Sequence, residues 1–114
     1  MGVKAVFHID DNTRWGLLLR NIQNVTKEVG SENSNLEVVA NAGAVEFYTG
    51  TPDKRDAELI RDLAGKGVRF IACRNALNGM GIRDDQLIPF VEIVPSGVLE
   101  LIARQSEGFA YIKP

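Results

Sequence analysis

The residues best suited to chemistry lie where buried apolar runs give way to polar sequence. The single cysteine, Cys73, ends the apolar run 68–73 and is followed by Arg74, Asn75 and a segment, 74–78, with a helical pattern. A helix N-terminus and a neighbouring arginine both favour the thiolate over the thiol. We therefore expect Cys73 to be a nucleophile or a sulfur carrier, with Arg74 and Asn75 as supporting residues. The alternative is a small buried apolar side chain, since free cysteines are among the most buried residues.

A second set of candidates follows the first two apolar runs. His8 lies near the end of the first run and could act as a base for Cys73 if the two segments are neighbours. A hydrogen-bonded structural role for His8 is the alternative. Asn41 and Gly43 follow the second run and could line the same pocket. No histidine is close to Cys73 in the sequence, which argues against protease-type chemistry.

Two adjacent carboxylates, Asp10 and Asp11, could hold a divalent cation. Response-regulator receiver domains use such a pair, and their last strand ends in Lys-Pro, as does this chain at Lys113 and Pro114. However, the third strand of a receiver domain ends in the phosphorylated aspartate, and this chain has Cys73 there. The simpler interpretation is that the aspartates cap the following helix. A receiver-like or metal-dependent phosphatase role stays an alternative, but we expect no metal.

The composition excludes several classes of protein. The chain has 114 residues, 13 Lys and Arg against 15 Asp and Glu, and a pI near 5.4, which indicates no nucleic-acid partner. One cysteine cannot form an internal disulfide, and one cysteine with one histidine cannot build a Cys/His zinc site. The first loop has no glycine, so we expect no nucleotide cofactor. No apolar run is long enough to span a membrane and none resembles an export signal, so we expect a cytoplasmic protein.

Five short apolar segments alternate with helical patterns along the chain, which we expect to form one domain over residues 1–114. Thr51 or Asp53 can cap the second helix, Pro52 fits its first turn, and the segment 79–81 (Gly-Met-Gly) should break the third helix. The predicted strands are 3–9, 36–40, 68–73, 91–94 and 109–112. The predicted helices are 15–29, 51–64, 74–78 and 97–107, with short turns at 44–48 and 84–87.

Strict alternation of strands and helices predicts an α/β fold with a mostly parallel five-stranded sheet and helices on both faces. Ligands of such sheets bind at the carboxyl ends of the strands. His8, Asn41, Cys73 and the segment 95–97 are all expected at that edge.

The order and spacing of several segments resemble the DsrE/DsrF/TusD-like family of small sulfur-relay proteins, and its stand-alone single-domain members in particular. The resemblance extends over nearly the whole chain. Its strongest parts surround Cys73 and the segment 94–98. The matching segments are Val-Phe-His-Ile-Asp-Asp at 6–11, Glu-Val-Val-Ala at 37–40 with Gly43, Gly-Val-Arg-Phe-Ile-Ala-Cys-Arg-Asn at 67–75, Val-Pro-Ser-Gly-Val at 94–98, and Gly-Phe-Ala-Tyr-Ile-Lys-Pro at 108–114.

This resemblance implies a three-layer α/β/α sandwich of the DsrEFH-like type and a sulfurtransferase or sulfur-carrier activity. Cys73 would accept sulfur as a persulfide from a donor protein and pass it to an acceptor protein. The resemblance also implies a homo-oligomer, either a trimer or a hexamer. The alternative function is a non-catalytic oligomeric module of the same fold that binds a small ligand or a protein.

Overall fold

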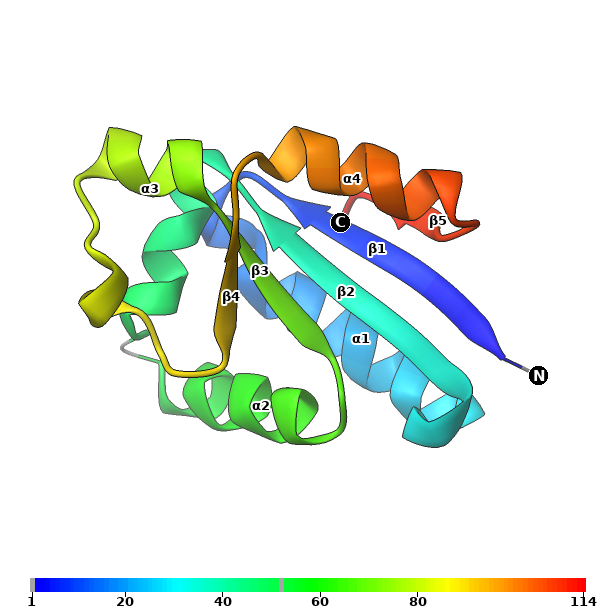
Figure 1. Cartoon of the computed structure of the whole chain (residues 1–114). Helices are drawn as coiled ribbons and strands as arrows, with labels where there is room; N and C mark the ends of the chain where they lie inside the picture. Colours follow the sequence, from blue (N-terminus) through cyan, green and yellow to red (C-terminus); the bar gives the residue numbers. More distant parts are fainter. Residues whose placement is uncertain (1, 52) are drawn as a thin grey trace.

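A computed structural model describes residues 2–51 and 53–114 (Figure 1). Strands and helices alternate as the apolar pattern predicts. The strands are β1 (Val3–Ile9), β2 (Ser34–Ala40), β3 (Arg69–Cys73), β4 (Val91–Val94) and β5 (Ala110–Ile112). The helices are α1 (Trp15–Val29), α2 (Lys54–Gly65), α3 (Arg74–Met80) and α4 (Gly97–Ser106), and the 3-10 helix η3 spans Ala42–Thr49.

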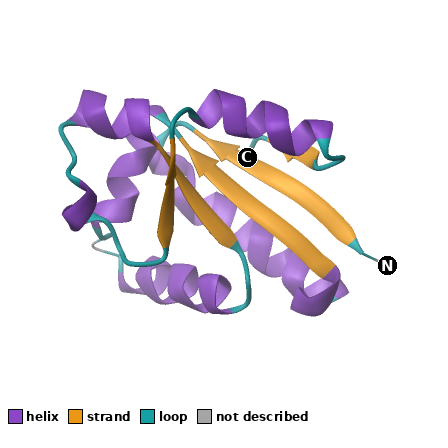
Figure 2. Ribbon diagram, viewed as in Figure 1, coloured by secondary structure: helices purple, strands orange, loops and turns teal. Residues whose placement is uncertain are grey.

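The five strands form one parallel sheet in the order β4-β3-β2-β1-β5, which confirms the predicted α/β architecture. From β1 to β4 the chain adds strands in one direction, and it then returns to place β5 beside β1. Crossovers between parallel strands are right-handed, so a reversal of direction moves the connecting helix to the other face of the sheet. Accordingly α4 packs on the face opposite to α1 and α2 (Figure 2).

Each face of the sheet has its own apolar cluster. The larger cluster joins the strands to α1, α2, α3 and η3, and in it Trp15 stacks on Phe47 with ring centroids 4.5 Å apart. The smaller cluster lies under α4. Its buried members are Val6, Val39, Ile71, Leu101 and Phe109.

The start of α2 and the end of α3 each depend on one residue. Asp53 caps α2 by accepting hydrogen bonds from the backbone N–H groups of Arg55 and Asp56, whereas Pro52 lies outside the described residues. The helix α3 ends within the predicted breaking segment 79–81, but it continues to Met80, two residues beyond the predicted end at 78. The chain leaves it at Gly81, whose φ of 68° lies in the left-handed region that glycine adopts without a steric penalty.

The outer side of α4 carries large apolar side chains that remain exposed. Leu99 is 64% exposed, and Val98 and Ile102 are each more than half exposed. None of the helices in the described part of the chain combines the length and the apolar character that a bilayer crossing requires.

Candidate functional site at the carboxyl edge of the sheet

Cys73 is the last residue of β3 and the N-cap residue of α3, as the sequence pattern predicts. Its side chain is only 6% exposed. The strand register places Cys73 level with Asn41, because Ala72 pairs with Ala40 in the neighbouring strand β2. The thiol therefore lies within the sheet edge rather than on an open loop.

The N-terminus of α4 lies directly on this edge. A Cβ atom added to Gly97 would stand 3.2 Å from the Cβ atom of Cys73, 3.3 Å from a methyl group of Val39 and 3.4 Å from the Cβ atom of Asn41. Ser96 caps the helix through its hydroxyl oxygen, which accepts a hydrogen bond from the N–H group of Leu99 at 3.3 Å. Glycine at position 97 thus permits the close approach that buries Cys73.

His8 forms hydrogen bonds with Asn41, which follows β2, and with Tyr111 of β5, and not with the thiol of Cys73. Its Nε2 atom lies 3.0 Å from Oδ1 of Asn41, and its Nδ1 atom lies 2.6 Å from the hydroxyl oxygen of Tyr111. An amide oxygen can only accept, so Nε2 of His8 is the donor in its hydrogen bond with Asn41. This pair of bonds fixes the orientation of the Asn41 side chain, whose amide nitrogen lies away from His8.

The other predicted site residues differ in their surroundings. The guanidinium of Arg74 donates to both carboxylate oxygens of Asp84, at 2.7 and 3.0 Å, and this hydrogen bonding lowers the pKa of Asp84. A role for Arg74 in holding the thiolate therefore stays a prediction. Asn75 is exposed on α3. A Cβ atom on Gly43 would meet nothing within 4 Å, so no close approach requires glycine there.

Backbone strain at this edge falls on the residue before Gly43. Ala42 has a φ of 49°, and it is the one non-glycine residue with positive φ in the described ranges. The left-handed conformation costs an alanine about 1 kcal/mol. The strain occurs directly after Asn41, where the chain turns from β2 into η3, so it contributes to the placement of that side chain.

The two aspartates after β1 have structural partners. The Asp11 side chain accepts hydrogen bonds from the hydroxyl and the N–H of Thr13 at the start of the first helical turn, which lowers the pKa of Asp11. Asp10 forms an ion pair with Lys113 at 3.1 Å. Within residues 2–51 and 53–114, no three His, Cys, Asp or Glu side chains converge as metal ligands would.

Glu37 is a buried polar residue that the sequence analysis did not single out. It interrupts the apolar strand β2 and is 1% exposed, facing the side of the sheet that α4 covers. The pKa of Glu37 is raised to about 8, mainly because the side chain is buried. A hydrogen bond with Glu100 and the negative charge of Glu100 also raise it. The charged residue within an otherwise apolar run was the available signal, because a strand buried on both faces should be continuously apolar.

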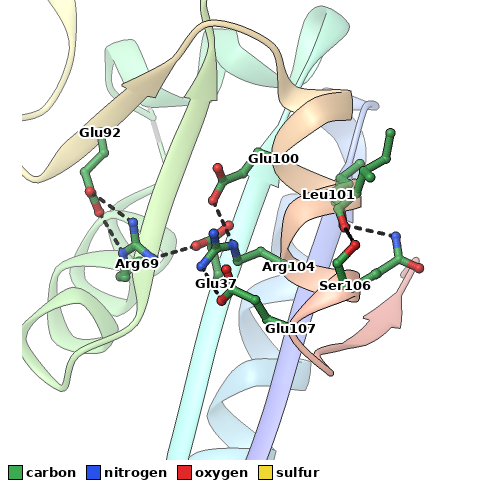
Figure 3. Close-up of polar contacts among 10 residues, drawn as sticks. Glu37, Arg69, Glu92, Glu100, Leu101, Arg104, Ser106 and Glu107 are labelled. Atoms are coloured by element: carbon green, nitrogen blue, oxygen red, sulfur yellow. Dashed lines mark hydrogen bonds and ion pairs between the residues drawn. The ribbon is translucent and has the colours of Figure 1, made fainter.

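Figure 3 shows the charged side chains around Glu37. Arg69 donates to Oε2 of Glu37 at 2.8 Å and to both carboxylate oxygens of Glu92, at 3.1 and 3.2 Å. Arg104 of α4 pairs with Glu107 at 2.9 Å and lies 3.5 Å from the carboxylate of Glu100. The cluster joins β2, β3 and β4 to α4.

Comparison with known proteins supports the same fold and confirms the family that the sequence resembles. Residues 4–114 match the DsrE/DsrF-like family. Among proteins with curated descriptions, none matches this sequence.

Solved structures match the chain over nearly its whole length. A protein of unknown function from Methanobacterium thermoautotrophicum is 38% identical with a TM-score of 0.85, and the match covers 98% of this chain and 99% of that one. The ychN protein from E. coli is 19% identical with a TM-score of 0.82 and the same coverage. A conserved protein of unknown function from Bacteroides thetaiotaomicron is 11% identical with a TM-score of 0.73, covering 97% and 94%. The last two comparisons concern the fold alone.

Proposed function

Because the chain belongs to the DsrE/DsrF-like family, we propose that it is a sulfur carrier that works through Cys73. The observation that most supports the proposal is the place of Cys73 at the carboxyl edge of the sheet, between Asn41 and the N-terminus of α4. Ligands of parallel sheets bind at this edge. As the only thiol of the chain, Cys73 has no internal partner with which to form a disulfide that would discard the sulfur.

The transfer step exchanges one sulfur–sulfur bond for another. The Cys73 thiolate attacks the terminal sulfur of a persulfide on the donor protein, a new S–S bond forms at Cys73, and the donor leaves as a thiolate. No net oxidation occurs, since the same sulfane sulfur is carried on. The reverse sequence on an acceptor thiol regenerates the Cys73 thiolate.

The supporting residues differ in how directly they reach the thiol. Asn41 flanks Cys73, and the hydrogen bond to His8 fixes its side chain, so we assign Asn41 a positioning role toward the sulfur. Arg74 and Asn75 follow Cys73 in α3 and would contact an incoming donor, while Gly43 belongs to the neighbouring η3. The proposal includes cytoplasmic donor and acceptor proteins and self-association into a trimer or hexamer. The exposed apolar side chains of α4 favour a protein-binding surface there.

The test is persulfide loading of the purified protein with a cysteine desulfurase and cysteine as the sulfur source. Intact mass spectrometry should show a gain of one sulfur atom on the wild type and no gain on Cys73→Ser. A known carrier loaded in parallel is the positive control. A wild-type protein that stays unmodified while the control loads would overturn the proposal.

Binding of a small apolar ligand is a second candidate function, and a separate groove favours it. The groove lies between α1 and the β1–β5 edge and has a volume of about 620 Å³, within the range of small-molecule sites. Val25 of α1 and Ile112 of β5 both line it. Binding of an apolar fluorescent dye that survives Cys73→Ser and is lost in Val25→Arg would support this function.

A further inference from the structure

A buried carboxyl group lies beneath α4, the helix that covers the Cys73 side of the sheet. The side chain of Glu37 is 1% exposed, and its Oε2 atom pairs with Arg69 at 2.8 Å. Its second oxygen, Oε1, receives no hydrogen bond from a donor within the described part of the chain. Carboxylates are rarely buried without full pairing, so an Oε1 atom without a donor favours the protonated form of this carboxyl group.

Glu100 of α4 lies in the same cluster, with its carboxylate 3.5 Å from the guanidinium of Arg104 (Figure 3), and its hydrogen bonding and charge raise the pKa of Glu37. Two carboxylates repel each other, but a carboxyl and a carboxylate can share one proton in a hydrogen bond. Other titratable or charged groups surround the pair, and each neighbouring element contributes at least one of them. They are Lys4 of β1, Tyr48 of η3, Arg69 of β3, Glu92 of β4, and Arg104 and Glu107 at the end of α4.

Cys73 lies under the other end of the same helix. Gly97, the first residue of α4, packs on the Cβ atom of Cys73, and Glu100 follows one turn later. Cys73 is 6% exposed, so a protein donor needs a movement of the elements around the sulfur, and α4 is in direct contact with this residue. The contact over Cys73 and the contact over Glu37 therefore belong to one rigid element.

We propose that a proton shared by Glu37 and Glu100 holds α4 against the sheet, and that loss of this proton releases the helix and uncovers Cys73. When the proton is lost, two carboxylates face each other under the helix. Release of α4 from the sheet lets water hydrate both carboxylates. We call this proton-dependent contact between α4 and the sheet the latch. It regulates access to Cys73, so its biological meaning rests on the proposed sulfur-carrier function.

The direction of the pH effect follows from proton linkage. The docked form holds the Glu37 proton with a pKa of about 8, whereas a hydrated glutamate in the released form has the ordinary value of 4.5. Between these values the released fraction rises by up to about tenfold for each pH unit, and above pH 8 it levels off. The rate of a thiol reaction also depends on pH through the thiol itself, so rates at Cys73 must be compared between variants at each pH.

Hydrogen exchange measured by mass spectrometry tests the latch from pH 6 to 9, with rates corrected for intrinsic exchange. In the wild type, protection of α4 should fall toward pH 8 and then level off, while protection of α1 stays constant. Glu37→Gln keeps an acceptor for Arg69 and a donor for Glu100 but cannot ionise, so its α4 protection should be flat. Glu92→Gln is the matched control, because it touches the same arginine outside α4, and it should follow the wild type.

Alkylation of Cys73 gives the second measurement. The ratio of the wild-type rate to the Glu37→Gln rate cancels the ionisation of the thiol, and it should rise from pH 6 to 8 before levelling off. Wild-type α4 protection that does not change with pH overturns the latch, even if the variant does not fold. An equal decline in Glu37→Gln also overturns it. Neither measurement uses sulfur transfer, so absence of persulfide loading would overturn the proposed function alone.

Discussion

The Cβ atom of Cys73 lies 3.2 Å from the position that a Cβ atom would occupy on Gly97. Atoms of Val39 and Asn41 stand at similar distances from the same position. The first turn of α4 therefore rests on the ends of two central strands, and the thiol is buried by backbone proximity rather than by a bulky side chain.

Replacing Gly97 by alanine should crowd this contact. Two of the three neighbouring atoms are Cβ atoms of the sheet edge and move only with the sheet, so we expect a loss of about 1–3 kcal/mol in the free energy of unfolding. Urea denaturation measures it. Gly79→Ala is the control, because a Cβ atom there meets nothing within 4 Å and should gain up to about 1 kcal/mol of helix stability. If Gly97→Ala had the same free energy of unfolding as the wild type, α4 would be able to shift and accommodate the methyl group, contrary to this prediction.

The buried carboxyl of Glu37 should make stability fall as pH rises. Its native pKa of about 8 lies above the unfolded value of 4.5, so the native state binds more protons between these values. The free energy of unfolding should then decrease by up to about 1.4 kcal/mol per pH unit over that window, with no further loss above it. Urea denaturation at pH 6, 7 and 8 should show a slope in the wild type that Glu37→Gln reduces. Equal slopes would contradict a buried proton.

The pairing of Arg74 with Asp84 should limit the influence of Arg74 on the thiol. Asp84→Asn removes the charge that holds the guanidinium, so we expect faster alkylation of Cys73 at pH 7. The two side chains are 37% and 59% exposed, so the stability loss should stay below about 1 kcal/mol. Asp85→Asn, which removes a different exposed ion pair, should leave the rate unchanged. Equal rates in the two variants would exclude Arg74 from the site.

Tyr111→Phe should disturb the site through His8. The change removes the hydroxyl that forms the 2.6 Å hydrogen bond with His8, which costs about 0.5–1.5 kcal/mol of stability and loosens Asn41. Persulfide loading of Cys73 should become slower. Tyr48→Phe is the informative control: it removes a buried hydrogen bond to the carbonyl of Ile71, so stability should fall without a change in loading. Slower loading in both variants would indicate a general loss of structure.

Self-association should depend on the exposed side of α4. Leu99→Lys places a charge on the most exposed apolar side chain of that helix, and light scattering after size exclusion should show a smaller assembly. Leu17→Lys on α1 is comparably apolar and exposed, and it should leave the assembly unchanged. The same mass for Leu99→Lys and the wild type would place the contact elsewhere.

Much of the fold was predictable because its signals are local. The apolar run at 3–9, which only Lys4 and His8 interrupt, predicts a strand buried on both faces. The helical spacing of Trp15, Leu18 and Ile22 predicts α1. Both are confirmed. The end of α3 was missed by two residues, because Gly79 is tolerated inside a helix when nothing else breaks the pattern.

The candidate site was predictable as a set of strand ends but not as a set of contacts. The sequence leaves His8 either as a base for Cys73 or as a hydrogen-bonded structural residue, and the structure joins it to Tyr111 and Asn41. The contact with Tyr111 depends on β5 returning beside β1, and a return of this kind leaves no periodic signal. Glu37 was overlooked for a related reason, since its partner Glu100 lies on a helix distant in sequence.

The sequence by itself determined the alternation of strands and helices, the single thiol and its place at the end of β3, because these depend on neighbouring residues and on counts. Only the tertiary structure decided that α4 packs on the side of the sheet that holds Cys73 and Glu37, and that Arg74 faces Asp84. The physical reason is that burial and charge pairing depend on strand order and on the handedness of crossovers, which bring together residues far apart in the chain.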